Sequence, residues 1–273
     1  ALHMEALATS KRELDALDFG SLVHHVLEAF GLDEEARELN KAEAIHQFLS
    51  SQLEQQVTER YGMTPPLPVQ VQSQIAERRL YAAAAVQAEE YAKGWRIEST
   101  EYKFERKLGG VEIRGRIDRI DRHETTGALR VLDYKSSTKA NPPFASHTAM
   151  RNDETPDYEV FDVTIKGRAK VRRWVDLQLP LYAWALKHET DLDLQLGYFN
   201  LPALGTDTGV QLLEPYTPEL QQHAMDCAST IVAKIKAQEF WPPKDKPKYD
   251  EFNGILFDQP EATAEHPQLE RDT

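Results

Sequence analysis

Two carboxylates and a lysine stand close together in a short, strand-like part of this sequence. The stretch 115–121 reads Gly-Arg-Ile-Asp-Arg-Ile-Asp, and after a polar turn the stretch 131–135 reads Val-Leu-Asp-Tyr-Lys. If the two stretches pair as a β-hairpin, Asp118, Asp133 and Lys135 converge. Carboxylate oxygens bind divalent cations, and such a cation can serve a hydrolytic water. The chemistry that these residues could do is therefore metal-assisted hydrolysis.

Strand periodicity decides which acidic residue faces this site. From Val111 to Ile117 apolar side chains occupy the odd positions, so that Asp118 falls on the polar side. Asp121 ranks second, because regular alternation points it to the opposite face. Taken alone, Asp-Tyr-Lys is typical of a surface ion pair worth under about 1 kcal/mol. An aspartate that ends an apolar strand is costly unless a cation offsets its desolvation, and this context favours a site.

Four motifs in a fixed order carry a family resemblance. They are Phe-Gly-Ser-Leu-Val-His followed by Leu-Glu within 19–28, the two hairpin stretches, and Asp-Leu-Gln-Leu-Pro-Leu-Tyr at 176–182. Together they resemble the PD-(D/E)XK nuclease superfamily, specifically its RecB-type exonuclease branch, which is often the C-terminal domain of helicase-nucleases. The resemblance implies an α/β fold with a restriction-endonuclease-like core, in which helices flank a central mixed β-sheet and an N-terminal helical portion is added.

The same resemblance assigns roles to the motif residues. It implies metal ligation by His24, Asp118, Asp133 and the backbone carbonyl of Tyr134, and places Lys135 beside the attacking water, so that Asp118, Asp133 and Lys135 form the catalytic set. The Gly-x-x-x-His spacing favours His24 over His25. Without the resemblance, a lone helical histidine is ordinarily a core or surface residue. Because His24 lies almost a hundred residues before the hairpin, the first helix must pack beside it.

Four further residues are candidates for bracing the site or contacting DNA: Gln178, Tyr182, Arg116 and Arg119. Gln178 and Tyr182 are four residues apart and share a helix face if Pro180 does not disrupt the helix. Ordinary packing of Tyr182 is an equally good interpretation.

The implied activity is a nuclease, most simply an exonuclease, that hydrolyses DNA phosphodiester bonds with Mg²⁺ or Mn²⁺, one or two ions. The implied setting is recombination or double-strand-break repair, with linear double- or single-stranded DNA and a helicase domain or subunit as partners. The alternative is a catalytically inactive DNA-binding or scaffolding domain of such a complex. Many relatives hold an iron-sulfur cluster through four cysteines. The single cysteine, Cys227, excludes such a cluster within this chain.

Composition restricts how this chain can meet DNA. The formal net charge of −13 argues against sequence-blind binding of polyanions over the whole surface, so any contact must be local. Two basic stretches are available: Arg114, Arg116, Arg119 and Arg122 around the hairpin, and Lys166, Arg168, Lys170, Arg172 and Arg173 downstream. For each stretch alone, a solvated face is the better interpretation. The absence of a bilayer-length apolar run and of a signal-peptide pattern predicts a cytoplasmic protein without a membrane partner.

Hydrophobic periodicity predicts the elements that hold these residues. Helices are expected over 13–31, 34–61, 69–93, 173–187 and 217–239, and strands over 97–107, 111–122, 128–136, 192–200 and 210–213. Gly31 is expected to cap the first helix, and 137–171 to form an exposed functional or mobile loop.

The expected organisation is one nuclease domain between two irregular ends. We expect an expression remnant and flexible N-terminus over 1–12, and the domain over 13–240. Within it, 13–94 is the helical portion and 95–240 holds the sheet core and its flanking helices. The stretch 241–273, rich in proline, is expected to be an irregular tail. The abrupt start before the first motif suggests a domain excised from a longer chain.

Overall fold

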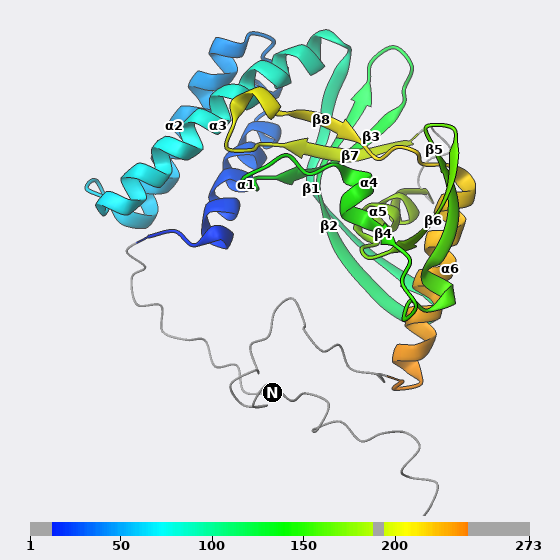
Figure 1. Cartoon of the computed structure of the whole chain (residues 1–273). Helices are drawn as coiled ribbons and strands as arrows, with labels where there is room; N and C mark the ends of the chain where they lie inside the picture. The colour runs from blue at the N-terminus through cyan, green and yellow to red at the C-terminus, as the bar shows by residue number, and fades with distance from the viewer. Residues whose placement is uncertain (1–12, 188–193, 240–273) are drawn as a thin grey trace, which may run out of the picture.

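The computed structural model describes residues 13–187 and 194–239 (Figure 1). The helices are α1 (Ala16–Leu32), η1 (Ala36–Glu38), α2 (Ala42–Tyr61), α3 (Leu67–Ala92), α4 (Pro143–His147), η2 (Asp157–Glu159), α5 (Gln178–Lys187), η3 (Gly205–Asp207) and α6 (Pro218–Lys236). The strands are β1 (Trp95–Leu108), β2 (Val111–His123), β3 (Leu129–Lys135), β4 (Thr148–Met150), β5 (Val160–Ile165), β6 (Arg168–Trp174), β7 (Leu194–Asn200) and β8 (Gly209–Leu212). The expectations for 1–12 and 241–273 lie outside these described residues.

A mixed five-stranded sheet forms the centre of the molecule. Its strand order is β1-β2-β3-β7-β8, with β3 and β7 parallel and the other neighbours antiparallel. The parallel step needs a crossover connection, and the chain between β3 and β7 includes α5. The predicted mixed α/β fold with an N-terminal helical portion is confirmed. None of the described helices is long and apolar enough to cross a membrane.

Helices α1, α2 and α3 cover one side of the sheet and share a core with Leu132, Tyr134 and Phe199 (Figure 1). The prediction that Gly31 caps α1 is wrong, because the helix continues through Leu32. Gly31 serves close packing instead: a Cβ there would lie 2.3 Å from Cγ2 of Thr100 in β1. The missing side chain lets α1 approach β1 closely.

Helix α5 packs on a second core that contains residues of β2, β3 and β7. Leu179 and Tyr182 of α5 belong to the same buried cluster as Ile117, Val131 and Leu196. The predicted helix over 173–187 begins too early, because α5 starts at Gln178. The Asp176 carboxylate accepts a hydrogen bond from the Gln178 backbone N–H at 2.7 Å, which satisfies a donor at the start of the helix.

The predicted helix over 34–61 begins too early, because α2 starts at Ala42 and residues 34–41 do not belong to it. The Asp33 carboxylate accepts hydrogen bonds from the backbone N–H groups of Glu35 and Ala36, at 3.0 and 2.8 Å. This local turn leads into the short helix η1 and separates α1 from α2.

The prediction that 137–171 forms a loop is wrong, because this stretch contains α4, β4, η2, β5 and the start of β6, and the three strands form a small sheet. The strand order is β4-β6-β5, and both neighbouring pairs are antiparallel. Strands β5 and β6 are joined by Lys166 and Gly167, whose φ angles are 49° and 74°. Two successive positive φ angles are typical of a type I′ hairpin turn. Strand β5 alternates regularly between apolar and polar residues, but it is short, and the high charge of β6 and of the surrounding stretch concealed the pattern.

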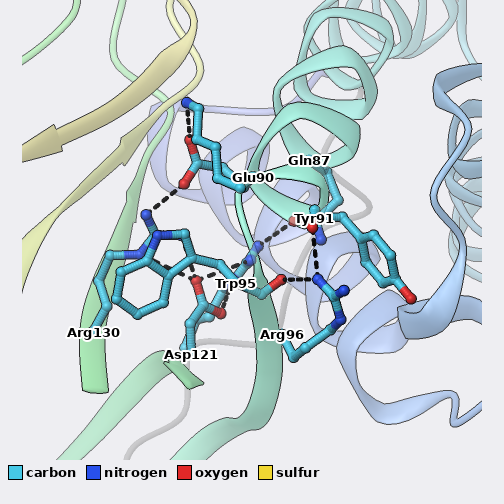
Figure 2. Close-up of polar contacts among 9 residues, drawn as sticks. Gln87, Glu90, Tyr91, Trp95, Arg96, Asp121 and Arg130 are labelled. Atoms are coloured by element: carbon cyan, nitrogen blue, oxygen red, sulfur yellow. Dashed lines mark hydrogen bonds and ion pairs between the residues drawn. The ribbon is translucent and has the colours of Figure 1, made fainter. Parts of the chain in front are cut away.

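A buried network of charges joins the end of α3 to β2 and β3 (Figure 2). We call Gln87, Glu90, Arg119, Asp121 and Arg130 the inner ion network. Arg119 and Arg130 both bind the Asp121 carboxylate, with closest N–O distances of 2.6 and 2.8 Å. Arg130 also pairs with Glu90 at 2.5 Å, and Arg119 donates to Gln87 Oε1 at 2.7 Å. All four charged side chains are at most 6% exposed, so each charge is offset by a fixed partner.

Candidate active site

Asp118 and Asp133 lie where the pairing of β2 with β3 ends. The last register pair toward this end joins Arg119 to Leu132, and the two aspartates are the next residues on their strands. The backbone N–H of Tyr134 donates to Asp118 Oδ2 at 2.9 Å, which holds the carboxylate against β3. Both carboxylates are largely withdrawn from solvent, at 12% and 5% exposure. The hairpin expected from the sequence therefore brings these residues together.

His24 reaches this place from α1, as expected. Its Nε2 lies 3.0 Å from the backbone oxygen of Tyr134, and its Nδ1 lies 3.6 Å from Asp118 Oδ2. Since a carbonyl can only accept, Nε2 carries the proton and donates, which leaves a lone pair on Nδ1 beside the carboxylate. The neighbouring His25 is exposed. The structure thus places His24, and not His25, at the hairpin.

Lys135 closes the other side of the site. Its Nζ lies 2.6 Å from Asp133 Oδ2, 3.4 Å from Gln178 Oε1 and 4.8 Å from the centre of the Tyr198 ring. Gln178 Nε2 in turn donates to the Tyr182 hydroxyl at 3.0 Å. Pro180 lies in the first turn of α5, where a missing N–H is tolerated, so Gln178 and Tyr182 do share a face. Both orient groups around the lysine rather than only filling the core.

The electrostatics of the site leave one carboxylate poorly compensated. Burial, followed by the negative charge of Asp133, raises the pKa of Asp118 to about 7. Burial also lowers the pKa of His24, which keeps its imidazole neutral near pH 7. Two aspartates therefore face one lysine and a neutral histidine. An additional cation would remove this imbalance.

The donor set fits a divalent cation of the Mg²⁺ or Mn²⁺ type. Carboxylate and carbonyl oxygens suit both ions, and the Nδ1 lone pair of His24 adds an imidazole that Mn²⁺ accepts readily. Among the described residues, no group of three or more His, Cys, Asp and Glu side chains stands in an arrangement that could hold a metal ion. Asp133 instead pairs with Lys135.

Glu101 lies near the site and was not expected from the sequence. It sits in β1 between Thr100 and Tyr102, whose register partners in β2 are Arg119 and Ile117, so Glu101 stands opposite Asp118. Its φ of 52° is unusual for a glutamate within a strand and marks local backbone strain. Its charge contributes to the raised pKa of Asp118. Strand alternation alone offers no signal for such a residue.

The two arginines proposed for bracing or DNA contact differ in exposure. Arg119 is 2% exposed within the inner ion network, so it cannot contact DNA, and that interpretation is wrong. Its guanidinium hydrogen-bonds the Tyr134 side chain and lies 5.7 Å from the Phe199 ring centre, so it braces β3 from behind. Arg116 is exposed and paired with Glu101. Asp121, the second-ranked carboxylate, is fully buried between Arg119 and Arg130.

Comparison with known families decides the assignment. The family model described as the PD-(D/E)XK nuclease superfamily matches residues 2–248. The chain belongs to this superfamily. Nucleases of this superfamily hydrolyse phosphodiester bonds of nucleic acids and typically use divalent metal ions.

More distant comparisons add little. Among curated proteins, none matches this chain significantly. One solved structure, a crystal structure from Eubacterium rectale described as "Putative exonuclease", shares 12% identity with it, with a TM-score of 0.42, over 81% of this chain and 68% of the other. A likeness at this level carries no functional inference.

Proposed function

We propose that this chain is a metal-dependent deoxyribonuclease of the RecB-type branch, with His24, Asp118, Asp133 and Lys135 as its site. The observation that carries the proposal is their convergence: three separate elements, α1, β2 and β3, deliver these side chains to one end of the sheet. Their chemistry matches the hydrolysis performed by the superfamily. Packing alone would not favour two buried carboxylates that share the charge of one lysine.

Each residue has a defined task in this proposal. Asp118, Asp133, the Tyr134 carbonyl and His24 Nδ1 would hold Mg²⁺ or Mn²⁺, which when bound supplies charge stabilisation for the scissile phosphate. Lys135 orients the attacking water and helps to remove its proton. Its ammonium is kept in place by Asp133, Gln178 and the Tyr198 ring. Gln178 is in turn held by Tyr182, so α5 positions the lysine from behind.

The decisive experiment compares wild type with Asp133→Asn and Lys135→Ala on linear DNA in Mg²⁺ and in Mn²⁺. We expect each variant to cleave at least about 100-fold more slowly, the range typical for loss of a proton-transfer or ligand group. The matched controls are Asp226→Asn and Lys103→Ala, which change the same residue types at exposed positions and should keep wild-type rates. Wild-type cleavage no faster than that of the site variants would support an inactive DNA-binding or scaffolding domain instead.

An exonuclease acting in recombination or double-strand-break repair, together with a helicase domain or subunit, is the finer form of this proposal. It rests on the RecB-type motifs quoted above. Exonuclease and endonuclease activity are distinguished by measuring cleavage of a linear duplex and of the same duplex closed into a covalent circle, because an exonuclease needs a free end. We expect degradation of the linear form only. Equal cleavage of the circle would show an endonuclease and exclude the exonuclease assignment.

A further inference from the structure

The hairpin formed by β5 and β6 carries exposed cations that nothing in the described structure neutralises. Lys166, Arg168 and Lys170 are all exposed. Within residues 13–187 and 194–239, none of these three side chains takes part in a hydrogen bond or an ion pair. We call these residues the hairpin cations. They stand out in a chain whose formal net charge is −13.

The other basic stretch of the sequence is different, because glutamates neutralise its exposed members. Arg114 pairs with Glu105 and Glu112 at 3.1 and 2.6 Å, and Arg122 pairs with Glu98. Arg116 is paired with Glu101, as described above. The glutamates offset the positive charge of these arginines, which weakens the attraction of an anionic ligand. The first basic stretch is therefore a poor candidate for a polyanion contact.

The downstream stretch divides into an inner and an outer part. Arg172 donates to the backbone oxygen of Thr148 at 3.0 Å and lies over the Phe144 ring, so it joins β6 to β4 and α4. Arg173 pairs with Glu159 at 3.3 Å. These two arginines fasten the root of the hairpin. Only the hairpin cations remain free for a partner.

Hairpin register gathers two of these cations on one face. Arg168 pairs with Ile165, and Lys170 pairs with Val163, so both cations and their apolar partners project to the same side. The exposed Asp162 pairs with Val171 and therefore projects to the opposite side. Lys166 occupies the tight turn at the tip. Asp162 is the one acidic residue among the hairpin residues 160–174, so the face that carries Arg168 and Lys170 has no carboxylate of the hairpin itself.

The root of the hairpin is fixed to the candidate active site. Strand β6 ends at Trp174, and Gln178, which contacts Lys135, follows after three residues. His147 of α4 is fully buried: its Nδ1 lies 3.0 Å from the Asp176 backbone oxygen, and the Tyr198 hydroxyl donates to its Nε2 at 2.8 Å. Tyr198 presents its ring to the Lys135 ammonium. The hairpin is thus held in a defined position relative to the lysine.

We propose that the hairpin cations form a second contact for the phosphate backbone of DNA whose scissile bond lies at Lys135. This inference rests on the proposed nuclease function and adds a binding surface to it. Arg168 is six residues from Trp174, roughly 20 Å along an extended strand. That length corresponds to about six base pairs of duplex, so the hairpin is long enough to contact DNA beyond the scissile bond. A local basic arm also explains how an acidic protein binds a polyanion.

The test measures binding of a fluorescent 30-base-pair duplex as a function of salt, in an Asp133→Asn background that leaves the duplex intact. The hairpin variant changes Lys166, Arg168 and Lys170 to serine. We expect at least about tenfold weaker binding, and a slope of log affinity against log salt that is smaller by roughly two to three, the value for three lost phosphate contacts.

Two matched variants make the result specific. Lys41→Ser, Arg78→Ser and Lys107→Ser together remove the same charge from exposed, dispersed positions, and binding should stay within about twofold of the background. The second variant, Lys166→Arg, Arg168→Lys and Lys170→Arg, keeps the charge and should bind DNA with the affinity of the Asp133→Asn background. A hairpin variant that binds as well as the dispersed control would overturn the proposal.

The same proteins separate this inference from the proposed function. With Asp133 restored, cleavage of linear DNA that is insensitive to the hairpin substitutions would reject the hairpin contact and leave the nuclease intact. Tight, hairpin-dependent binding without any cleavage by wild type would reject the nuclease and keep the contact. Thermal midpoints of all variants should match their background, because every altered side chain is exposed.

Discussion

The inner ion network and the candidate active site lie on opposite faces of the same two strands, β2 and β3. By alternation, Arg130 on β3 and Asp121 on β2 face α3, whereas Asp133 and Asp118 face the other side. In the network, two arginines meet two carboxylates, with Lys93 also binding Glu90 at 2.7 Å. In the site, two carboxylates meet one lysine. Each carboxylate of the network therefore has cationic partners, whereas the two carboxylates of the site share one lysine.

This difference separates buried charges that have fixed partners from buried charges that lack them. In the network, burial alone would raise the pKa of Glu90, but hydrogen bonds from Lys93 and Arg130 hold it below its usual value. In the site, burial and a second carboxylate raise the pKa of Asp118, and the nearby Lys135 lowers it too little to reverse the shift. Buried charge with fixed partners holds α3 to the sheet. Buried charge without them favours binding of a cation.

The largest effect should follow from breaking the network. Arg130→Met leaves Asp121 and Glu90 with fewer cationic partners in a buried place, and we expect a loss of about 3 to 5 kcal/mol in the free energy of unfolding. Urea denaturation measures it. Arg122→Met is the control, because its pair with Glu98 is about 40% exposed and worth under about 1 kcal/mol. Equal losses in the two variants would contradict the comparison.

Filling the site with a cation should stabilise the protein by a smaller amount. At a Mn²⁺ concentration of 100 times the dissociation constant, we expect a gain of about 2.7 kcal/mol. Thermal unfolding with and without Mn²⁺ measures this gain, and Asp133→Asn should abolish most of it. A gain of the same size in the Asp133→Asn variant would place the cation elsewhere.

Removing the charge of Asp118 should stabilise the metal-free protein at high pH. Because the pKa of Asp118 is raised to about 7, its stability contribution is fully present below the unfolded pKa near 4 and is lost as pH rises to 7. Asp118→Asn escapes this loss, and we expect a gain of roughly 2 kcal/mol at pH 8 and little gain at pH 4. Urea denaturation of wild type and variant at pH 4 and pH 8, in the presence of a metal chelator, measures both gains. A gain independent of pH would refute the assigned cause.

The smallest effect should come from Glu101. Its negative charge adds to the raised pKa of Asp118, so Glu101→Gln should move the pH midpoint of the Asp118-linked stability loss downward, by less than about one unit. Stability measured across pH 4 to 8 gives this midpoint. The control is Glu105→Gln, an exposed residue of the same strand, which should leave the midpoint in place.

Much of the candidate site could be predicted because it depends on local geometry. Alternation along a strand has a period of two residues, so the faces of Asp118, Asp121, Asp133 and Lys135 follow from their positions alone. The same holds for the pairing of β2 with β3, since a short turn joins them. The face of the hairpin that carries the candidate site could therefore be predicted from the sequence.

Features that depend on distant partners could not be predicted in this way. Arg119 looked like a surface cation, but Asp121 and Gln87 enclose it once α3 packs on the sheet. Residues 137–171 looked like a loop, because the strands that they form are stabilised by pairing with each other and by contacts such as His147 with Tyr198. Weak local preference is overridden by tertiary contacts in such segments.

The sequence by itself determined which residues are candidates for the chemistry and which face of the hairpin they occupy, because residue type and strand periodicity are local properties. Only the tertiary structure decided how the charges are balanced. It placed two arginines behind the hairpin, left the carboxylates in front with a single lysine, and set Glu101 beside Asp118. Charge balance is a sum over neighbours in space, and these neighbours come from α1, α3, β1 and β3.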